Sequence, residues 1–221
     1  MCGRFAFYSP SEATAALFGV DAAAAVEPRH NIAPTQFIAA IRRDDEKNNE
    51  LTMLRWGLVP SWAKDPSIGN RMINARAETV AEKPSFRTAY RKRRCLILAD
   101  GFYEWHTEND VKIPYYISLA NGSPFAFAGL WEHWQSKSTD ESLQTTTIVT
   151  TAANEFLSQL HHRMPIVLEP GPATRWLDGD MGLLAELTAN APEFQAWPVD
   201  RLVNNARNES PDLINPAGDK I

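Results

Sequence analysis

The sequence has few cysteines, no long apolar run and no excess of basic charge. Two cysteines in 221 residues cannot form a disulfide scaffold, so we expect a protein of a reducing, intracellular compartment, most simply the cytoplasm. No segment is apolar for long enough to cross a membrane, and the first residues show no signal-peptide pattern. The formal net charge of −5 argues against binding nucleic acid through a broad positive surface, so any polyanion site must be local.

The chain also lacks internal repeats, low-complexity tracts and a linker long enough to divide it. With 44% hydrophobic residues it fits one globular domain. Strand-like runs outnumber helical ones and do not alternate with them, which predicts an α+β fold around a curved or barrel-like sheet. We expect strands at 36–41, 51–56, 95–100, 113–119, 125–130, 145–150 and 165–168, helices at 11–19, 84–94, 152–160 and within 172–187, and an alanine-rich turn or helix at 22–25.

The strongest chemical feature is Cys2, which directly follows Met1. Removal of Met1 would leave an α-amine and a thiol on adjacent carbons. An aldehyde would condense with the amine to an imine, and the thiol would then close a five-membered thiazolidine, which an internal cysteine cannot form. Ordinary pKa values near ~8 for the amine and ~8.5 for the thiol leave a usable unprotonated fraction of each at neutral pH. Cys95 lies in an apolar run, which predicts a buried strand residue.

Two polar residues follow an extended apolar approach at what we interpret as a helix start. Asn74 either orients an amine or a sugar oxygen, or caps the helix. Arg76 either grips a phosphate or forms a surface salt bridge. A basic run at 91–94 is typical of a solvated helix end.

Glu104 follows an apolar strand and lies among Phe102, Tyr103 and Trp105. Burial there would raise the pKa of its carboxyl and suit it to proton transfer near neutral pH, whereas the alternative is an exposed glutamate on a strand. His161 and His162 would point to opposite faces of an extended chain, so only one would enter a given cleft.

A zinc site is not expected, because the other histidines are scattered at 30, 106 and 133 without ligand spacing. Prolines and aromatic residues in the segments 31–34 and 56–62, among them Pro34, Trp56 and Trp62, could stack on or wedge between unpaired bases. They could equally plug the ends of a barrel.

Taken in order, these stretches resemble the SRAP (SOS-response-associated peptidase) family. The resemblance covers roughly residues 1 to 205 and rests on Met1-Cys2-Gly3-Arg4-Phe5, Asn31-Ile32-Ala33-Pro34, Trp56-Gly57-Leu58-Val59-Pro60-Ser61-Trp62, Asn74-Ala75-Arg76-Ala77-Glu78-Thr79, Ala99-Asp100-Gly101-Phe102-Tyr103-Glu104-Trp105 and His161-His162-Arg163-Met164-Pro165. It implies an α+β fold in which bifurcated, antiparallel-rich sheets form a pseudo-barrel flanked by short helices. One domain would span 1–221, with residues from about 207 onward as a candidate flexible tail.

The resemblance also implies covalent capture of abasic sites in single-stranded DNA, which protects the lesion in the DNA damage response. Removal of Met1, for which the family is named a peptidase, would expose the reactive cysteine. The implied catalytic residues are Cys2, Asn74, Glu104 and His161, and the implied DNA contacts are Arg4, Pro34, Trp62, Arg76 and Arg163. No cofactor or metal is implied. We expect a monomer that joins the nucleoid when bound to DNA and meets replication or repair proteins there.

Two other functions stay open at the level of sequence. N-terminal-nucleophile glutamine amidotransferases also begin Met-Cys-Gly and use the cysteine to attack an amide. A noncovalent single-strand binder, in which Cys2 is incidental, is the second alternative. A glutaminase assay tests the first, and a denaturing gel separates the second from covalent capture.

Overall fold

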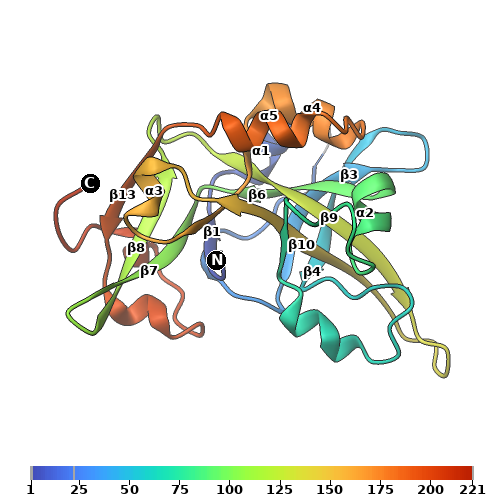
Figure 1. The fold of residues 1–221 in the computed structure, drawn as a ribbon, viewed down its shortest axis with the longest axis horizontal. Helices are drawn as coiled ribbons and strands as arrows, with labels where there is room; N and C mark the ends of the chain where they lie inside the picture. Colours follow the sequence, from blue (N-terminus) through green and yellow to red (C-terminus); the bar gives the residue numbers. More distant parts are fainter. Residues whose placement is uncertain (1, 22, 221) are drawn as a thin grey trace.

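The computed structural model describes residues 2–21 and 23–220, and its centre is a closed five-stranded barrel (Figure 1). Going round the barrel, the strands are β10 (Ser142–Ala152), β4 (Asn49–Trp56), β3 (Phe37–Arg43), β6 (Arg94–Ala99) and β9 (Phe125–Gln135), which pairs again with β10. Only the β4–β10 pair of this ring is parallel. The predicted α+β pseudo-barrel is confirmed.

A second, antiparallel sheet lies against the barrel. Its strands run in the order β13 (Phe194–Pro198), β8 (Val111–Leu119), β7 (Gly101–Glu108), β1 (Phe5–Phe7) and β2 (Arg29–Ile32). Phe5 joins the two sheets, because its ring meets those of Trp56 and Phe127 edge to face at centroid distances of 5.3 and 5.5 Å. The first strand of the chain is therefore fixed between the sheet and the barrel.

Three short strands extend the barrel along β10 and β9. The first, β5 (Asn74–Arg76), runs parallel to β10, and the second, β11 (Arg163–Pro165), pairs antiparallel with the other edge of β10. The third, β12 (Val167–Leu168), pairs with β9. Each has at most three residues, so its geometry depends on the long strand beside it rather than on local propensity.

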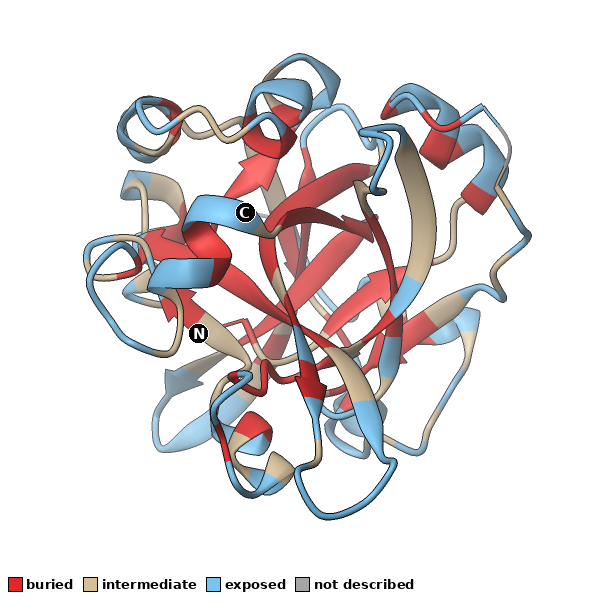
Figure 2. Ribbon diagram, turned by 90° about the vertical axis from the view of Figure 1, so that its right-hand side faces the viewer, coloured by how far each residue is buried: buried red, intermediate tan, exposed pale blue. Residues whose placement is uncertain are grey.

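The helices are short and lie on the outside, with their buried residues facing the strands (Figure 2). They are α1 (Ser11–Leu17), α2 (Arg87–Lys92), α3 (Glu155–Ser158), α4 (Pro170–Leu177) and α5 (Leu183–Ala189), with 3₁₀ turns at η1 (Pro66–Arg71), η2 (Arg201–Asn204) and η3 (Pro211–Ile214). No helix within the described ranges is both long and apolar enough to span a bilayer.

Two predicted helices are shorter than the sequence indicated. The helix expected at 84–94 is limited to 87–92, because Arg94 pairs with Leu130 of β9 and begins a strand. The helix expected at 152–160 is limited to 155–158, since β10 continues to Ala152 and the side chain of Asn154 caps the helix by accepting from the Leu157 N–H at 2.9 Å. Residues 23–25 are neither helix nor strand, and Ala22 lies outside the described residues.

The basic run at 91–94 does not behave as one solvated helix end. Arg91 and Lys92 are exposed as expected, but Arg94 is 5% exposed. Its guanidinium lies 4.4 Å from the ring centroids of both Tyr90 and Trp176. It also donates to the main-chain carbonyls of Tyr90 and Asp180, each at 2.8 Å. Arg94 is thus a buried cation that joins β6 to the outer helices.

The last residues, considered a candidate tail, contact β13. Leu213 of η3 is 2% exposed, and the Trp197 indole donates to the carbonyl of Ile214 at 2.7 Å. Val199 and Pro216 form an isolated antiparallel bridge. These contacts make residues up to 216 part of the packed domain.

Candidate active site

Cys2 lies at the start of the chain just before β1, and its side chain is fully buried. Its thiol donates a long hydrogen bond to the carbonyl oxygen of Arg4, with 3.9 Å between sulfur and oxygen. Burial raises the pKa of the Cys2 thiol well above its usual range, and the neighbouring Glu104 carboxylate raises it further. The thiol is therefore protonated at neutral pH and needs a base before it can act as a nucleophile.

Asn74 is the first residue of β5, so its predicted place at a helix start is wrong. The segment is extended because it pairs with the free edge of β10: Ile148 N–H donates to Ile73 at 3.1 Å, and Ala77 N–H donates to Thr150 at 2.8 Å. The Asn74 side-chain amide donates to the main-chain carbonyl of Cys2 at 2.8 Å. Its Oδ1 is buried and has no hydrogen-bond partner within the described part of the chain.

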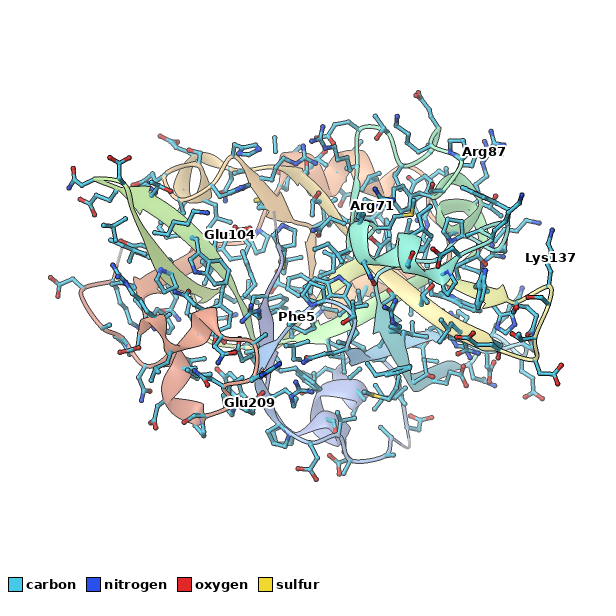
Figure 3. The ribbon with its side chains drawn as sticks, turned by 90° about the horizontal axis from the view of Figure 1, so that it is seen from below. Phe5, Arg71, Arg87, Glu104, Lys137 and Glu209 are labelled. Atoms are coloured by element: carbon cyan, nitrogen blue, oxygen red, sulfur yellow. The ribbon has the colours of Figure 1, made fainter. Side chains whose placement is uncertain are left out.

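Glu104 lies in the middle of β7, on the strand next to that of Phe5 (Figure 3). Phe5 pairs with Phe102, and the Tyr103 N–H donates to Arg4 at 2.9 Å, so this register places Gly3 opposite Glu104. Gly3 has no side chain to separate the carboxylate from Cys2. Glu104 is 5% exposed, and burial raises the pKa of its carboxyl. Of the two alternatives left open by the sequence, the buried glutamate is the one observed.

His161 and His162 are stacked on each other, with ring centroids 4.3 Å apart and planes inclined by 28°. The expectation that they point to opposite faces is wrong, because they lie in the turn before β11 and not in an extended strand. His161 is half-buried, and desolvation lowers the pKa of its ring. Its Nδ1 accepts from the Arg163 N–H at 2.9 Å. The Arg163 carbonyl oxygen lies 3.2 Å from the same nitrogen, so the main chain of Arg163 holds the His161 ring through Nδ1.

The three arginines implied as phosphate contacts differ in their surroundings. The Arg4 guanidinium donates through Nη1 to Asn31 Oδ1 at 2.6 Å and to the Val203 carbonyl at 2.7 Å. Arg163 is paired with the carboxylate of Glu78. Arg76 is exposed at the end of β5. Of the three, Arg76 is the one presented directly to solvent.

The aromatic and proline loops are only partly exposed. Trp62 is 55% exposed and Pro34 is half-buried, beside Thr35 with its positive φ of 74°. Trp56, by contrast, is completely buried, and its indole donates to the Ile73 carbonyl at 2.9 Å. The barrel-plug interpretation therefore holds for Trp56, while Trp62 remains available to a ligand.

The structure thus brings Cys2, Asn74 and Glu104 together from three separate segments, and the electrostatic effect of His162 on Glu104 places the stacked histidine pair near them. Sequence reasoning missed Asn31, which accepts from Arg4, and Glu78, which pairs with Arg163. Asn31 is fully buried, and its amide donates to the carbonyls of Asn205 and Asn208 at 3.0 and 2.8 Å. Both missed residues lie inside motifs noted from the sequence, and membership of those motifs was the available signal. Among the described residues no group of three His, Cys, Asp or Glu side chains could hold a metal ion.

Comparison with known proteins connects this arrangement to one family. The family model for SOS response associated peptidase (SRAP) matches residues 1–206. The abasic site processing protein YoaM of Bacillus subtilis is 43% identical over 226 residues, which cover 97% of this chain and 98% of YoaM. The abasic site processing protein YedK of Escherichia coli is 33% identical over 228 residues, covering 98% of this chain and all of YedK.

The fold agrees with a solved structure as well. A crystal structure of a protein from Bacteroides thetaiotaomicron superposes with a TM-score of 0.87 at 26% identity, covering 98% of this chain and 100% of that one. A family match over nearly the whole chain, relatives aligned along their full length and the same fold lead to one assignment. The chain belongs to the SOS response associated peptidase (SRAP) family.

Proposed function

We propose that this protein processes abasic sites by capturing them covalently in single-stranded DNA through Cys2. Relatives that align over their full length are named abasic site processing proteins. The observation that carries the proposal is the placement of Cys2: its carbonyl is held by Asn74 at 2.8 Å, and its thiol lies in the field of buried Glu104. Such a site can hold both groups of a 1,2-aminothiol beside a proton carrier.

The reaction begins with hydrolysis of the Met1–Cys2 peptide bond, which we assign to the protein itself as its peptidase activity. The free amine of Cys2 adds to the C1′ aldehyde of the ring-opened abasic sugar and gives a carbinolamine. Loss of one water leaves an imine. The thiol then adds across the C=N bond, and its proton goes to the nitrogen. One C–N bond and one C–S bond form, one water leaves, and no oxidant or reductant is needed.

The proton transfers fall to Glu104 and His161. Burial raises the pKa of the Glu104 carboxyl, so it can protonate the departing hydroxyl of the carbinolamine and then accept the thiol proton. A base is needed at this step because burial also raises the pKa of the thiol. Desolvation lowers the pKa of His161, which favours a neutral ring that can exchange protons with the sugar. The same groups in reverse order would open the ring, as a lyase-type step.

DNA contacts follow from the exposed groups around this site. Arg76, two residues after Asn74, supplies a phosphate contact, and Arg4 and Arg163 can add to it only by exchanging internal partners. Trp62 and Pro34 offer stacking and kinking surfaces to the bases. A few arginines close to the site are enough for a protein with a net charge of −5 to bind DNA, because the covalent bond then keeps the DNA attached.

The test is the intact mass of the purified protein before and after incubation with an abasic single-stranded oligonucleotide. We expect loss of Met1, then a heat-stable adduct heavier by the oligonucleotide minus one water. Cys2→Ala abolishes the adduct, and Cys95→Ala retains it, since Cys95 is a buried strand residue of the barrel. An equal yield from Cys2→Ala would overturn the proposal. Binding without a shifted band on a denaturing gel would indicate the noncovalent alternative, and glutamine hydrolysis the amidotransferase.

A further inference from the structure

We infer that Glu78 and Arg163 form a positioning clamp that sets the separation of Asn74 and His161. Its effect on capture rests on the proposed function, but its effect on the His161 ring does not. Glu78 would then position site residues, a function not assigned to it above. Arg163 would serve to hold this pair as well as, or instead of, contacting a phosphate.

The topology places the two clamp residues on opposite sides of β10. In one row across the three strands, Thr150 of β10 lies between Arg76 of β5 and Pro165 of β11. Asn74 begins β5, and Glu78 lies just beyond its end. His161 lies two residues before Arg163, the first residue of β11. A bond between Glu78 and Arg163 therefore ties the segment of Asn74 to the segment of His161 across the strand that separates them.

The contacts are those of a fixed pair. Arg163 Nη1 donates to Glu78 Oε1 at 2.6 Å, and Nη2 donates to Oε2 at 3.0 Å, the bidentate arrangement. Nη2 also donates to the main-chain carbonyl of Thr150, in the intervening strand, at 2.8 Å. The Arg163 side chain is 11% exposed, so a DNA phosphate would have to displace a carboxylate from a nearly buried cation.

The main chain of Arg163 connects the clamp to the His161 ring. The N–H of Arg163 donates to His161 Nδ1 at 2.9 Å, and the Arg163 carbonyl oxygen lies 3.2 Å from the same nitrogen, so the Arg163 main chain fixes the orientation of the ring. Loss of Glu78 would release the Arg163 side chain and allow this turn to shift. A misplacement of about 1 Å at a reacting group can cost about a hundredfold in rate.

The test compares Glu78→Ala, Glu78→Gln, Arg163→Ala and the double variant Glu78→Ala/Arg163→Ala with wild type. Three quantities are measured: the single-turnover rate of adduct formation, the affinity for an undamaged single-stranded oligonucleotide, and the ¹⁵N shifts of the His161 ring. Glu186→Ala is the matched control, because it removes an exposed partner of Arg175, 2.9 Å away, on the outer helices. Thermal melting confirms that each variant is folded.

We expect each alanine variant to lower the rate about tenfold or more, with Glu78→Gln in between. The double variant should be no slower than the slower single variant, since the two residues act as a unit. Affinity for undamaged DNA should be unchanged in Glu78→Ala, and the ¹⁵N shifts of the His161 ring should differ from those of wild type. Glu186→Ala should match wild type in all three.

Three results would overturn the clamp: additive losses in the double variant, a wild-type His161 spectrum in Glu78→Ala, or faster capture by Glu78→Ala. The last would show that Glu78 merely blocks Arg163 from phosphate. Absence of any adduct from wild type would instead refute the proposed function, and the His161 spectra would still decide the clamp.

Discussion

The side-chain amide of Asn74 donates to the main-chain carbonyl of Cys2 over 2.8 Å, and so ties the second residue of the chain to a strand 72 residues later. The bond fixes the backbone that carries the amine and the thiol of Cys2. We therefore expect Asn74 to act on the orientation of the aminothiol.

Replacing Asn74 by alanine should slow adduct formation without abolishing it. A neutral hydrogen bond contributes about 0.5–1.5 kcal/mol, which corresponds to about two- to tenfold in rate if the bond is felt in the transition state. Single-turnover kinetics with abasic oligonucleotide measure the change. Asn121→Ala, in an exposed turn, is the control. A wild-type rate for Asn74→Ala would remove Asn74 from the site.

Replacing Glu104 by glutamine should change how stability depends on pH. Burial raises the pKa of this carboxyl, so the folded state favours its neutral form. The resulting stabilisation is fully present below the ordinary carboxyl pKa of about 4.3 and is lost as pH rises through the folded value. Glutamine cannot ionise, so the melting temperature of Glu104→Gln minus that of wild type should increase from pH 4 to pH 8. Thermal melting at a series of pH values measures this difference. Glu108→Gln, exposed on the same strand, is the matched control. Parallel curves for Glu104→Gln and wild type would contradict the expected burial cost.

Salt should slow capture but leave completed adducts intact, because only the encounter depends on phosphate contacts. We expect Arg76→Ala to lower the capture rate and to reduce the slope of log rate against log salt by about one. Rates between low and moderate salt measure this. Arg87→Ala, exposed at the start of α2 (Figure 3), should retain the wild-type slope. The same slope in Arg76→Ala would mean that Arg76 contacts no phosphate.

Replacing Arg94 by leucine should destabilise the fold by about 2–4 kcal/mol. The change removes two buried cation–π contacts and leaves two main-chain carbonyl groups without their hydrogen-bond donor. Urea unfolding with an unchanged m-value would measure the loss. Arg91→Leu, exposed in α2 three residues earlier, should stay within about 0.5 kcal/mol of wild type. A similarly small loss in Arg94→Leu would show that the buried cation is replaceable by an apolar side chain.

The long apolar strands were predictable because their pattern is local. The runs at 125–130 and 145–150 lie in barrel strands, and so does the run at 95–100 except for Asp100, which follows β6. The pair around the loop 42–50 is β3 and β4. The first and last residues of helices and strands were less predictable where they depend on contacts with residues distant in the sequence. Arg94 belongs to a strand because β9 pairs with it and Trp176 covers it, and the sequence around residue 94 contains neither signal.

The candidate residues of the site could be proposed from residue type and motif, but the contacts that hold them could not. Cys2 and Glu104 have an intrinsic chemistry that the sequence reveals. Asn74 was assigned to a helix start because a three-residue strand exists only where β10 offers an edge. Glu78 and Arg163 lie 85 residues apart, so their pairing depends on how β5 and β11 flank β10.

The central position of β10 has a consequence for exchange of amide hydrogens. This strand pairs with β9, β4, β5 and β11. Residues on both of its edges hold the segments of Asn74 and His161, so neither segment can open while β10 stays paired. The amides of β10 should therefore exchange only through global unfolding. The segments of Asn74 and His161 should show the same protection against exchange as the core, and should not open as a separate unit of lower stability.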